Sequence, residues 1–273
     1  MMISCFIPSL SVVYLAKRCA FLLLLLCMYG CQSAANKPNI RVAAAASVQF
    51  ALEALIADYE SKESIHIDAV IASSGKLTAQ IIQGAPYDLF LSADTSYPNY
   101  IYQKQKCLQE PVIYGQGQLV LWTSERQIKP LKIDFLKDPS INKIALADPN
   151  TAPFGQLSVQ FLQQQHLWQQ LSPKLVFGES IAQVNQYVST QAVDIGLTSL
   201  SIVLSEAAAD KGSFLPLPYY IPQSMVLLAN KKGPKDASLQ FYRYLQSQAA
   251  NLGKLFFIIT ETLEVYQKHL TKI

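Results

Sequence analysis

The stretch Ala43-Ala44-Ala45-Ala46-Ser47 joins an apolar run to a helical pattern. The run at 40–42 is typical of a short buried strand. From Val48 to Tyr59, apolar residues recur at spacings of three and four, which predicts a helix with one apolar stripe. We therefore expect Ser47 at a strand-to-helix turn, in the position that caps the N-terminus of the helix.

A second turn of the same kind follows at Ala72-Ser73-Ser74-Gly75, between an apolar run at 65–71 and a helical pattern that begins at Leu77. A helix N-terminus carries backbone N–H groups without partners and a partial positive charge, and a serine hydroxyl adds another donor. Two such turns at the ends of neighbouring parallel strands would form a donor-lined pocket suited to an anion. The alternative is that Ser47 and Ser74 are ordinary helix caps, since serine is a preferred capping residue.

Apolar runs typical of strands alternate with helical patterns along the rest of the chain. This alternation predicts an α/β fold with mostly parallel strands and helices on both faces of the sheet. After the two turns, the expected strands lie at 87–92, 118–123, 143–147, 174–177, 193–197 and 224–229, and the expected helices include 94–106, 156–170 and 237–248.

Two lobes are expected, because the composition changes after the strand at 118–123 and a late strand returns to the first lobe. Residues 39–117 and 224–273 would form lobe 1, with an apolar terminal helix at 252–270, and residues 118–223 would form lobe 2. Two chain crossings leave a cleft between the lobes. The second lobe would contribute turns at Phe154, at Ile181 and near Ser199 to that cleft.

The N-terminal segment is typical of a secretory signal, which we place at residues 1–31, followed by a polar tether at 32–38. A basic pair at 17–18 precedes an apolar run at 20–28 that is too short for a comfortable membrane span. Cys31 resembles the acylated cysteine of a lipoprotein signal, although Met28 and Tyr29 depart from the usual pattern. We expect a periplasmic protein, with two alternatives: a lipid anchor at Cys31, or a signal that is simply cleaved.

Nucleic-acid binding and common enzyme chemistry find little support in the sequence. A net charge of +3, with scattered Lys and Arg, is too weak for a nucleic-acid surface. His66, His166 and His269 are far apart, and none belongs to a nucleophile or metal motif. Cys107 has lysine neighbours that could lower its pKa, but no base follows it, so a partly buried thiol is the simpler interpretation. We do not expect an enzyme.

Several stretches together resemble the periplasmic molybdate-binding proteins of molybdate ABC transporters, from about Asn39 to Leu245. These stretches are Ala44-Ala45-Ala46-Ser47, Ala72-Ser73-Ser74-Gly75, the block Gly84-Ala85-Pro86-Tyr87-Asp88-Leu89-Phe90-Leu91-Ser92-Ala93-Asp94, and Asp148-Pro149 followed by Pro153-Phe154-Gly155. The resemblance implies the type II periplasmic binding-protein fold, with two α/β lobes, a hinge and a buried oxyanion. It also implies an ABC permease and its ATPase as partners, and we expect a monomer.

The resemblance also implies ligand residues. Ser47 and Ser74 match the family's two serines, and the backbone N–H groups of Phe154 and Ile181 match its second-lobe donors. Many members have a tyrosine where this chain has Ser199, after Gly196-Leu197-Thr198. Either Ser199 donates its own hydroxyl, or the anion loses one donor.

Molybdate is a doubly charged oxyanion without a proton near neutral pH, so its site needs donors and no acceptor. Serine hydroxyls and backbone N–H groups supply such donors, at roughly 1.5–3 kcal/mol for each bond to a charged group. We expect molybdate or tungstate as the ligand and no cofactor. Sulfate, or another divalent oxyanion, is the main alternative. Asp88 and Asp94 could be metal ligands, but the simpler interpretation gives Asp94 a helix-capping role.

Overall fold

The computed structural model describes residues 39–124, 131–205, 208, 211–230, 233 and 235–248. The expected signal segment with Cys31, the tether at 32–38 and the apolar tail at 252–270 lie outside these ranges. Every described residue belongs to one compact unit, within the range Pro38–Ile273. Across the described ranges, no helix is both long and apolar enough to cross a membrane.

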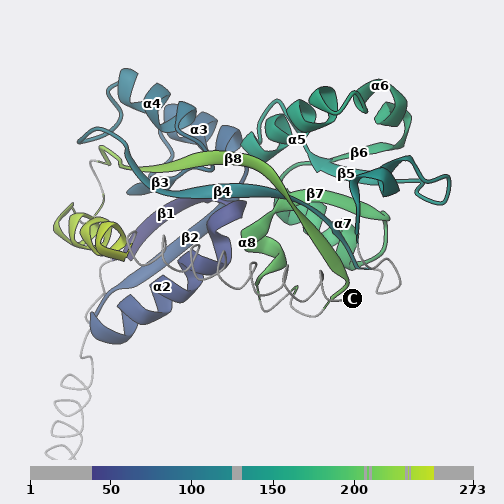
Figure 1. Ribbon diagram of the computed structural model, residues 1–273. Helices are drawn as coiled ribbons and strands as arrows, with labels where there is room; N and C mark the ends of the chain where they lie inside the picture. The colour runs from purple at the N-terminus through teal and green to yellow at the C-terminus, as the bar shows by residue number, and fades with distance from the viewer. Residues whose placement is uncertain are drawn as a thin grey trace, which may run out of the picture. The chain divides into compact units, whose positions relative to one another are not determined.

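Within the described residues, eight strands form one twisted sheet in the order β2-β1-β3-β8-β4-β7-β5-β6 (Figure 1). At one end, β1 pairs in parallel with β2 and β3, and at the other end β5 pairs in parallel with β6 and β7. The strands are β1 (Asn39–Ala45), β2 (His66–Ala72), β3 (Leu89–Leu91), β4 (Val112–Thr123), β5 (Ile144–Ala147), β6 (Leu175–Gly178), β7 (Ile195–Ser199) and β8 (Ser213–Leu227).

The two central strands, β4 and β8, are antiparallel to each other and join the two parallel sets of strands. They are 12 and 15 residues long, much longer than the strands predicted at 118–123 and 224–229. The structure therefore confirms the α/β fold and corrects these two elements. The lobe boundaries expected at 117/118 and 223/224 fall inside β4 and β8, and the division into lobes stays a prediction.

Helices cover both faces of the sheet, as Figure 1 shows. Along β1, Ile40, Val42 and Ala44 pack in one cluster with α2 and the helix of residues 235–248, whereas Ala43 packs on the opposite face with α3 and α4. This alternation is what a strand buried on both faces requires. The helices are α2 (Gln49–Lys62), α3 (Ser74–Ile82), α4 (Ser96–Gln103), α5 (Pro153–Gln164), α6 (Trp168–Leu171), α7 (Ile181–Ser189) and α8 (Leu200–Val203), with short 3-10 turns η1 (Ala46–Val48), η2 (Ile133–Lys137) and η3 (Ser172–Lys174).

A separate apolar cluster fills the part of the unit built on β5, β6 and β7. It includes Ile144 and Ile195 from the strands, Phe161 from α5, and Val184 and Val188 from α7. We call this part the second half. The first half is built on β1, β2 and β3 with α2, α3, α4 and the helix of residues 235–248.

Two predicted helices differ from the observed ones in ways that the backbone explains. The helix expected at 156–170 is two helices, because His166 has a positive φ of 57°, a conformation that ends an α-helix. The helix expected directly after Ser47 begins at Gln49, because the 3-10 turn η1 comes first.

Candidate functional site

Ser47 lies in η1, immediately beyond the end of β1, and is almost fully buried, with 4% of its surface exposed. The N-cap residue of α2 is Val48, and no side chain makes a capping hydrogen bond at either η1 or α2. Ser47 is therefore not a helix cap, and its buried hydroxyl needs another explanation.

Ser74 is the first residue of α3 and is completely buried. The N-cap position belongs to Ser73, and its side chain makes no capping hydrogen bond. The alternative that Ser47 and Ser74 are ordinary caps is therefore wrong at both turns. Ser73 also carries a buried hydroxyl, for which the described residues provide no hydrogen-bond partner.

The hydrogen bonds of the two serines leave each hydroxyl free to act as a donor. Ser47 Oγ accepts a bond from Gln223 Nε2 at 2.9 Å, and Ser74 Oγ accepts a bond from the backbone N–H of Ala93 at 3.0 Å. A hydroxyl has one hydrogen and two acceptor positions. Because both bonds are accepted and no acceptor for either hydrogen is found among the described residues, each serine keeps its hydrogen for another partner.

The second half brings two helix N-termini to the same place. Phe154 is the second residue of α5, which starts at Pro153, and Ile181 is the first residue of α7. Backbone N–H groups in the first turn of a helix have no acceptor within that helix. A side chain on Gly155 would place its Cβ 2.3 Å from the carbonyl oxygen of Ala147, so the glycine allows α5 to start tightly against the end of β5.

These four residues line one small cavity between the halves. Ser47 and Ser74 come from the first half, and Phe154 and Ile181 come from the second. The cavity measures about 10 Å³, close to the space that one water molecule requires. Among the described residues that line it, none carries a charge, and the rest are small: Ala45, Ala46, Ala72, Ser73, Ala93, Ala152, Pro153 and Ser180.

Ser199 is the predicted site residue that the structure does not place on the cavity lining. Its Oγ lies 2.7 Å from Ser201 Oγ, and Ser201 Oγ donates to the backbone carbonyl of Ser47 at 2.6 Å. Since the hydrogen of Ser201 is used in that bond, Ser199 is the donor to Ser201. This geometry favours the alternative in which the anion has one donor fewer, and it gives Ser199 a supporting place behind Ser47.

Direct contacts hold the two halves together around the cavity. The backbone N–H of Gly75, in α3, donates to the carbonyl oxygen of Thr151, just before α5, at 2.9 Å. Next to it, Lys76 Nζ lies 2.5 Å from Glu179 Oε1, and both side chains are about half exposed. The structure therefore shows the two halves in contact at the edge of the cavity.

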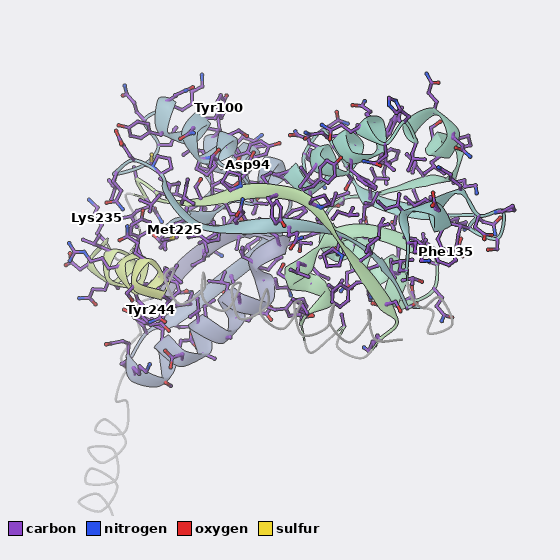
Figure 2. The ribbon with its side chains drawn as sticks, viewed as in Figure 1. Asp94, Tyr100, Phe135, Met225, Lys235 and Tyr244 are labelled. Atoms are coloured by element: carbon purple, nitrogen blue, oxygen red, sulfur yellow. The ribbon has the colours of Figure 1, made fainter. Side chains whose placement is uncertain are left out.

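The two carboxylates that the sequence offered as metal ligands are occupied by other groups. Asp94, labelled in Figure 2, accepts bonds from Ser92 Oγ, from the Ser96 hydroxyl and from the backbone N–H of Tyr97 in the first turn of α4. The N-cap residue of α4 is Thr95, so Asp94 bonds to this helix from one position before the cap. Asp88 accepts from the backbone N–H of Arg41 and from Asn230 Nδ2, each at 2.8 Å, and burial raises the pKa of Asp88. Among the described residues, no group of three or more His, Cys, Asp and Glu side chains could hold a metal ion.

Cys107 is a free, partly exposed thiol. Burial raises its pKa above the ordinary value, so the possibility that neighbouring lysines lower the pKa is wrong. The interpretation of Cys107 as a partly buried thiol agrees with the structure.

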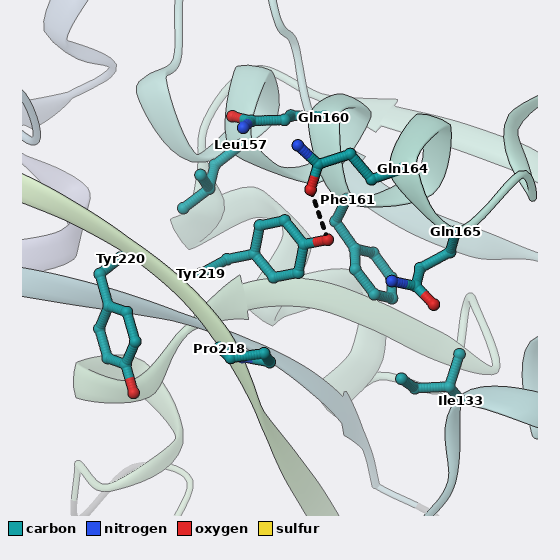
Figure 3. Close-up of a pocket in the computed structure, with 9 residues that line it drawn as sticks. All are labelled: Ile133, Leu157, Gln160, Phe161, Gln164, Gln165, Pro218, Tyr219 and Tyr220. Carbon is teal, nitrogen blue, oxygen red and sulfur yellow. Dashed lines mark hydrogen bonds between the residues drawn. The ribbon is translucent and has the colours of Figure 1, made fainter.

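A larger depression of about 430 Å³ lies elsewhere, between α5 and β8. Figure 3 shows that Tyr219 reaches across it, where its hydroxyl donates to Gln164 Oε1 at 2.7 Å. Apart from these two residues it is lined by Ile133, Leu157, Gln160, Phe161, Gln165, Pro218 and Tyr220. None of the predicted ligand residues is among them, so size alone does not identify the functional site.

Sequence reasoning missed Gln223 and Ser73. Gln223 is a buried polar residue in the middle of β8, and Ser73 is the first serine of the Ser-Ser-Gly turn. A lone glutamine immediately before the apolar run 224–229 was the available signal for Gln223. Its partner Ser47 is 176 positions away in the chain, and no local pattern reveals such a contact.

Several known proteins are similar to this chain over most of its length. A family model described as bacterial extracellular solute-binding protein matches residues 40–251. The molybdate-binding protein ModA of Rhodobacter capsulatus is 32% identical over 175 residues, which cover 62% of this chain and 67% of that protein. ModA of Azotobacter vinelandii is 29% identical over 219 residues, covering 77% of this chain and 85% of that protein.

A solved structure shows the same fold. The periplasmic molybdate-binding protein of Azotobacter vinelandii superimposes with a TM-score of 0.74 at 26% sequence identity. The match covers 79% of this chain and 96% of that structure.

Proposed function

The chain belongs to the bacterial extracellular solute-binding proteins, and from this premise we propose that it captures molybdate outside the cytoplasm for an ABC importer. The relatives named as molybdate-binding proteins support this ligand. Ser47 and Ser74 would donate through their hydroxyls, and Phe154 and Ile181 would donate through their backbone N–H groups.

The observation that carries the proposal is the state of the two serine hydroxyls. Each accepts a hydrogen bond from the protein, and no described residue accepts the hydrogen of either hydroxyl. Together with the starts of α5 and α7, they present donors to a cavity lined by uncharged residues. Helix N-termini also favour negative charge. Such a site matches an oxyanion that carries no proton and needs no acceptor.

The same donor-only chemistry argues against phosphate, which still carries a proton near neutral pH. A buried phosphate would profit from a carboxylate acceptor, but no carboxylate is among the described residues that line the cavity. Asp94 already accepts hydrogen bonds from Ser92, Ser96 and Tyr97. Tungstate has the same charge and nearly the same size as molybdate. We therefore propose that tungstate binds at the same site.

Sulfate is the second candidate, because the small cavity of about 10 Å³ favours the smaller of two dianions with the same shape. Either anion requires the residues that line the cavity to shift, because the cavity has room for about one water molecule. The sequence relatives favour molybdate over sulfate. Direct competition between the two anions decides the question.

The proposed working cycle is a hinge motion about β4 and β8. Lobe 1, residues 39–117 and 224–273, would move against lobe 2, residues 118–223. An anion that bonds to both lobes stabilises the closed form because it binds that form better than the open form. An ABC permease with its ATPase would then accept the ligand from a monomeric binding protein. A lipid anchor at Cys31 would keep this protein at the membrane.

Thermal unfolding with and without added anions tests the proposal. A ligand that binds only the folded state raises the unfolding temperature by mass action. We expect molybdate and tungstate to raise it clearly, and sulfate and phosphate to raise it little at the same concentration. A rise with sulfate alone would transfer the function to sulfate, and no rise with any of the four would contradict oxyanion binding.

A further inference from the structure

Gln223 is a buried polar side chain on β8, one of the two strands that join the halves. It is 1% exposed, and its backbone pairs with Gly115 of β4. Its amide nitrogen donates to Ser47 Oγ at 2.9 Å. Gln223 does not line the cavity itself, so any effect on a ligand must pass through Ser47.

The direction of this bond decides what Ser47 can do. Since Nε2 can only donate, it occupies an acceptor position of the hydroxyl and leaves the hydrogen of Ser47 unused. Without that donor, the hydroxyl could rotate and turn its hydrogen away from the cavity. The backbone carbonyl of Ser47 is fixed separately by Ser201, at 2.6 Å. Gln223 therefore controls the direction of the Ser47 O–H bond, which the backbone contacts do not fix.

Close packing holds the amide of Gln223 in place. A Cβ on Gly117 of β4 would lie 3.0 Å from Gln223 Nε2 and 2.7 Å from the Cζ atom of Phe154. The amide and the Phe154 ring thus both pack over a strand position without a side chain. Gln223 therefore lies close to two proposed ligand residues, Ser47 of the first half and Phe154 of the second half.

The stability of the fold alone does not explain a glutamine at position 223. Its Oε1 is buried, and no hydrogen-bond partner for it is found among the described residues. An unsatisfied buried acceptor costs free energy, and removing it while keeping the shape can be neutral or stabilising. A methionine of similar length would fill the same space without that cost. The glutamine is better explained by what its nitrogen does for Ser47.

We propose that Gln223 is a positioning residue that orients the Ser47 hydroxyl as a donor to the bound oxyanion. This inference rests on the proposed function, because it assigns Gln223 a role at the same site. It also explains how a site without a tyrosine at position 199 keeps the Ser47 hydroxyl directed as a donor, because the orientation comes from Gln223 on β8.

A double-mutant cycle tests this role by calorimetric titration with molybdate. The proteins are the native chain, Gln223→Met, Ser47→Ala and the variant with both changes. We expect Gln223→Met to weaken binding about five- to ten-fold, as the loss of one directed hydrogen bond would. In the Ser47→Ala background the same change should have no further effect, because the hydroxyl that Gln223 orients is gone.

Thermal unfolding without ligand distinguishes a positioning role from a structural one, because loss of a residue that supports the fold would lower the unfolding temperature. Gln223→Met should unfold at the native temperature or above it. Gln118→Met is the matched control, because Gln118 is a glutamine on β4 whose amide donates to the carbonyl of Leu217 rather than to a site residue. It should leave molybdate affinity unchanged. Equal losses of affinity from Gln223→Met with and without Ser47 would overturn the proposal, and so would native affinity in Gln223→Met.

Gln223→Glu keeps the size of the side chain and serves if the methionine variant does not fold. An ionised carboxylate can only accept, so it would draw the hydrogen of Ser47 away from the anion. A protonated carboxyl could donate to Ser47 again. Burial favours the protonated form, so molybdate affinity of Gln223→Glu should recover as the pH falls, while that of the native protein stays nearly constant. A parallel pH profile for both proteins would contradict the positioning role.

Titration of the native protein with molybdate distinguishes a failure of the positioning role from a failure of the proposed function. Binding by the native protein without coupling between Gln223 and Ser47 would reject the positioning role and leave the proposed function intact. No binding by the native protein would reject both.

Discussion

The backbone N–H of Gly75 donates a hydrogen bond to the carbonyl oxygen of Thr151 at 2.9 Å. Gly75 belongs to the first half and Thr151 to the second, so this bond links the halves directly beside Ser74. A Cβ on Gly75 would lie 2.8 Å from that carbonyl oxygen and 2.7 Å from the hydroxyl of Tyr97. The halves can therefore approach this closely only with glycine at position 75.

Gly75→Ala should weaken molybdate binding about ten-fold. Overpacking of this kind costs roughly 1–3 kcal/mol, and it destabilises only the closed form, in which position 75 contacts Thr151. Alanine also favours the helical conformation of α3, so unfolding without ligand should change little. Calorimetric titration with molybdate measures the affinity, and urea unfolding without ligand measures the stability. Gly115→Ala is the control, since nothing lies within 4 Å of a Cβ there. Native affinity in Gly75→Ala would show that the Gly75–Thr151 contact plays no part in closure.

Ser47→Ala and Ser74→Ala should each weaken molybdate binding by about one to two powers of ten, because each removes a hydrogen bond to a charged group worth roughly 1.5–3 kcal/mol. Ser199→Ala should cost less, because the Ser199 hydroxyl bonds to Ser201 and not to the cavity. Titration calorimetry on the three variants gives the comparison. A loss for Ser199→Ala as large as the other two would make Ser199 a direct donor.

Phe154→Ala should distinguish the contribution of the Phe154 backbone N–H from that of its ring. The ring is buried, and its loss should lower the free energy of unfolding by about 3–5 kcal/mol. The proposed ligand is the backbone N–H, which the substitution retains, so molybdate affinity should change by only a few-fold. Urea unfolding and calorimetry test the two parts. A large loss of affinity in a folded variant would mean that the ring itself shapes the site.

Alkaline conditions should destabilise the contact between Tyr244, labelled in Figure 2, and α2. The Tyr244 hydroxyl donates to Asp58 Oδ2 at 2.6 Å. Burial and this bond to Asp58 raise the pKa of Tyr244 to about 12, from an ordinary value of 10.0. The neutral phenol is thus favoured by folding, so its contribution is fully present below pH 10 and is lost as the pH rises towards about 12.

Urea unfolding of the native protein and of Tyr244→Phe, below pH 10 and then between pH 10 and about 12, measures this effect. The native protein should lose more stability over the alkaline range than the variant, which has no phenol to ionise at this position. Tyr220→Phe changes an exposed ring and serves as the control. If the native protein and Tyr244→Phe lost the same stability over the alkaline range, ionisation of Tyr244 would not be the cause.

The turns that carry Ser47 and Ser74 could be predicted from sequence, because apolar periodicity changes from strand to helix at each of them. The exact place of Ser47 could not, since a 3-10 turn between β1 and α2 leaves no periodic signal. The length of β8 was missed for a different reason. Pro216, Pro218 and Pro222 lie within this strand, and prolines normally argue against a strand.

The hydrogen bonds of the site depend on contacts between distant parts of the chain. Gln223 and Ser47 are separated by 176 positions, and Ser201 and Ser47 by 154. Periodicity reports local structure and the buried face of each element, but it does not say which side chains from different elements meet. The family resemblance predicts which residues bind the ligand, whereas the hydrogen bonds that orient the hydroxyls come from the structure.

Calorimetric titration of the native protein with molybdate, and then with sulfate in competition, tests the central claim most directly. Four donor bonds to a dianion are sufficient for a dissociation constant below about 1 μM. We predict such binding for molybdate at one site per chain, with sulfate unable to displace it at equal concentration. Tighter binding of sulfate than of molybdate, or no heat with either anion, would contradict it.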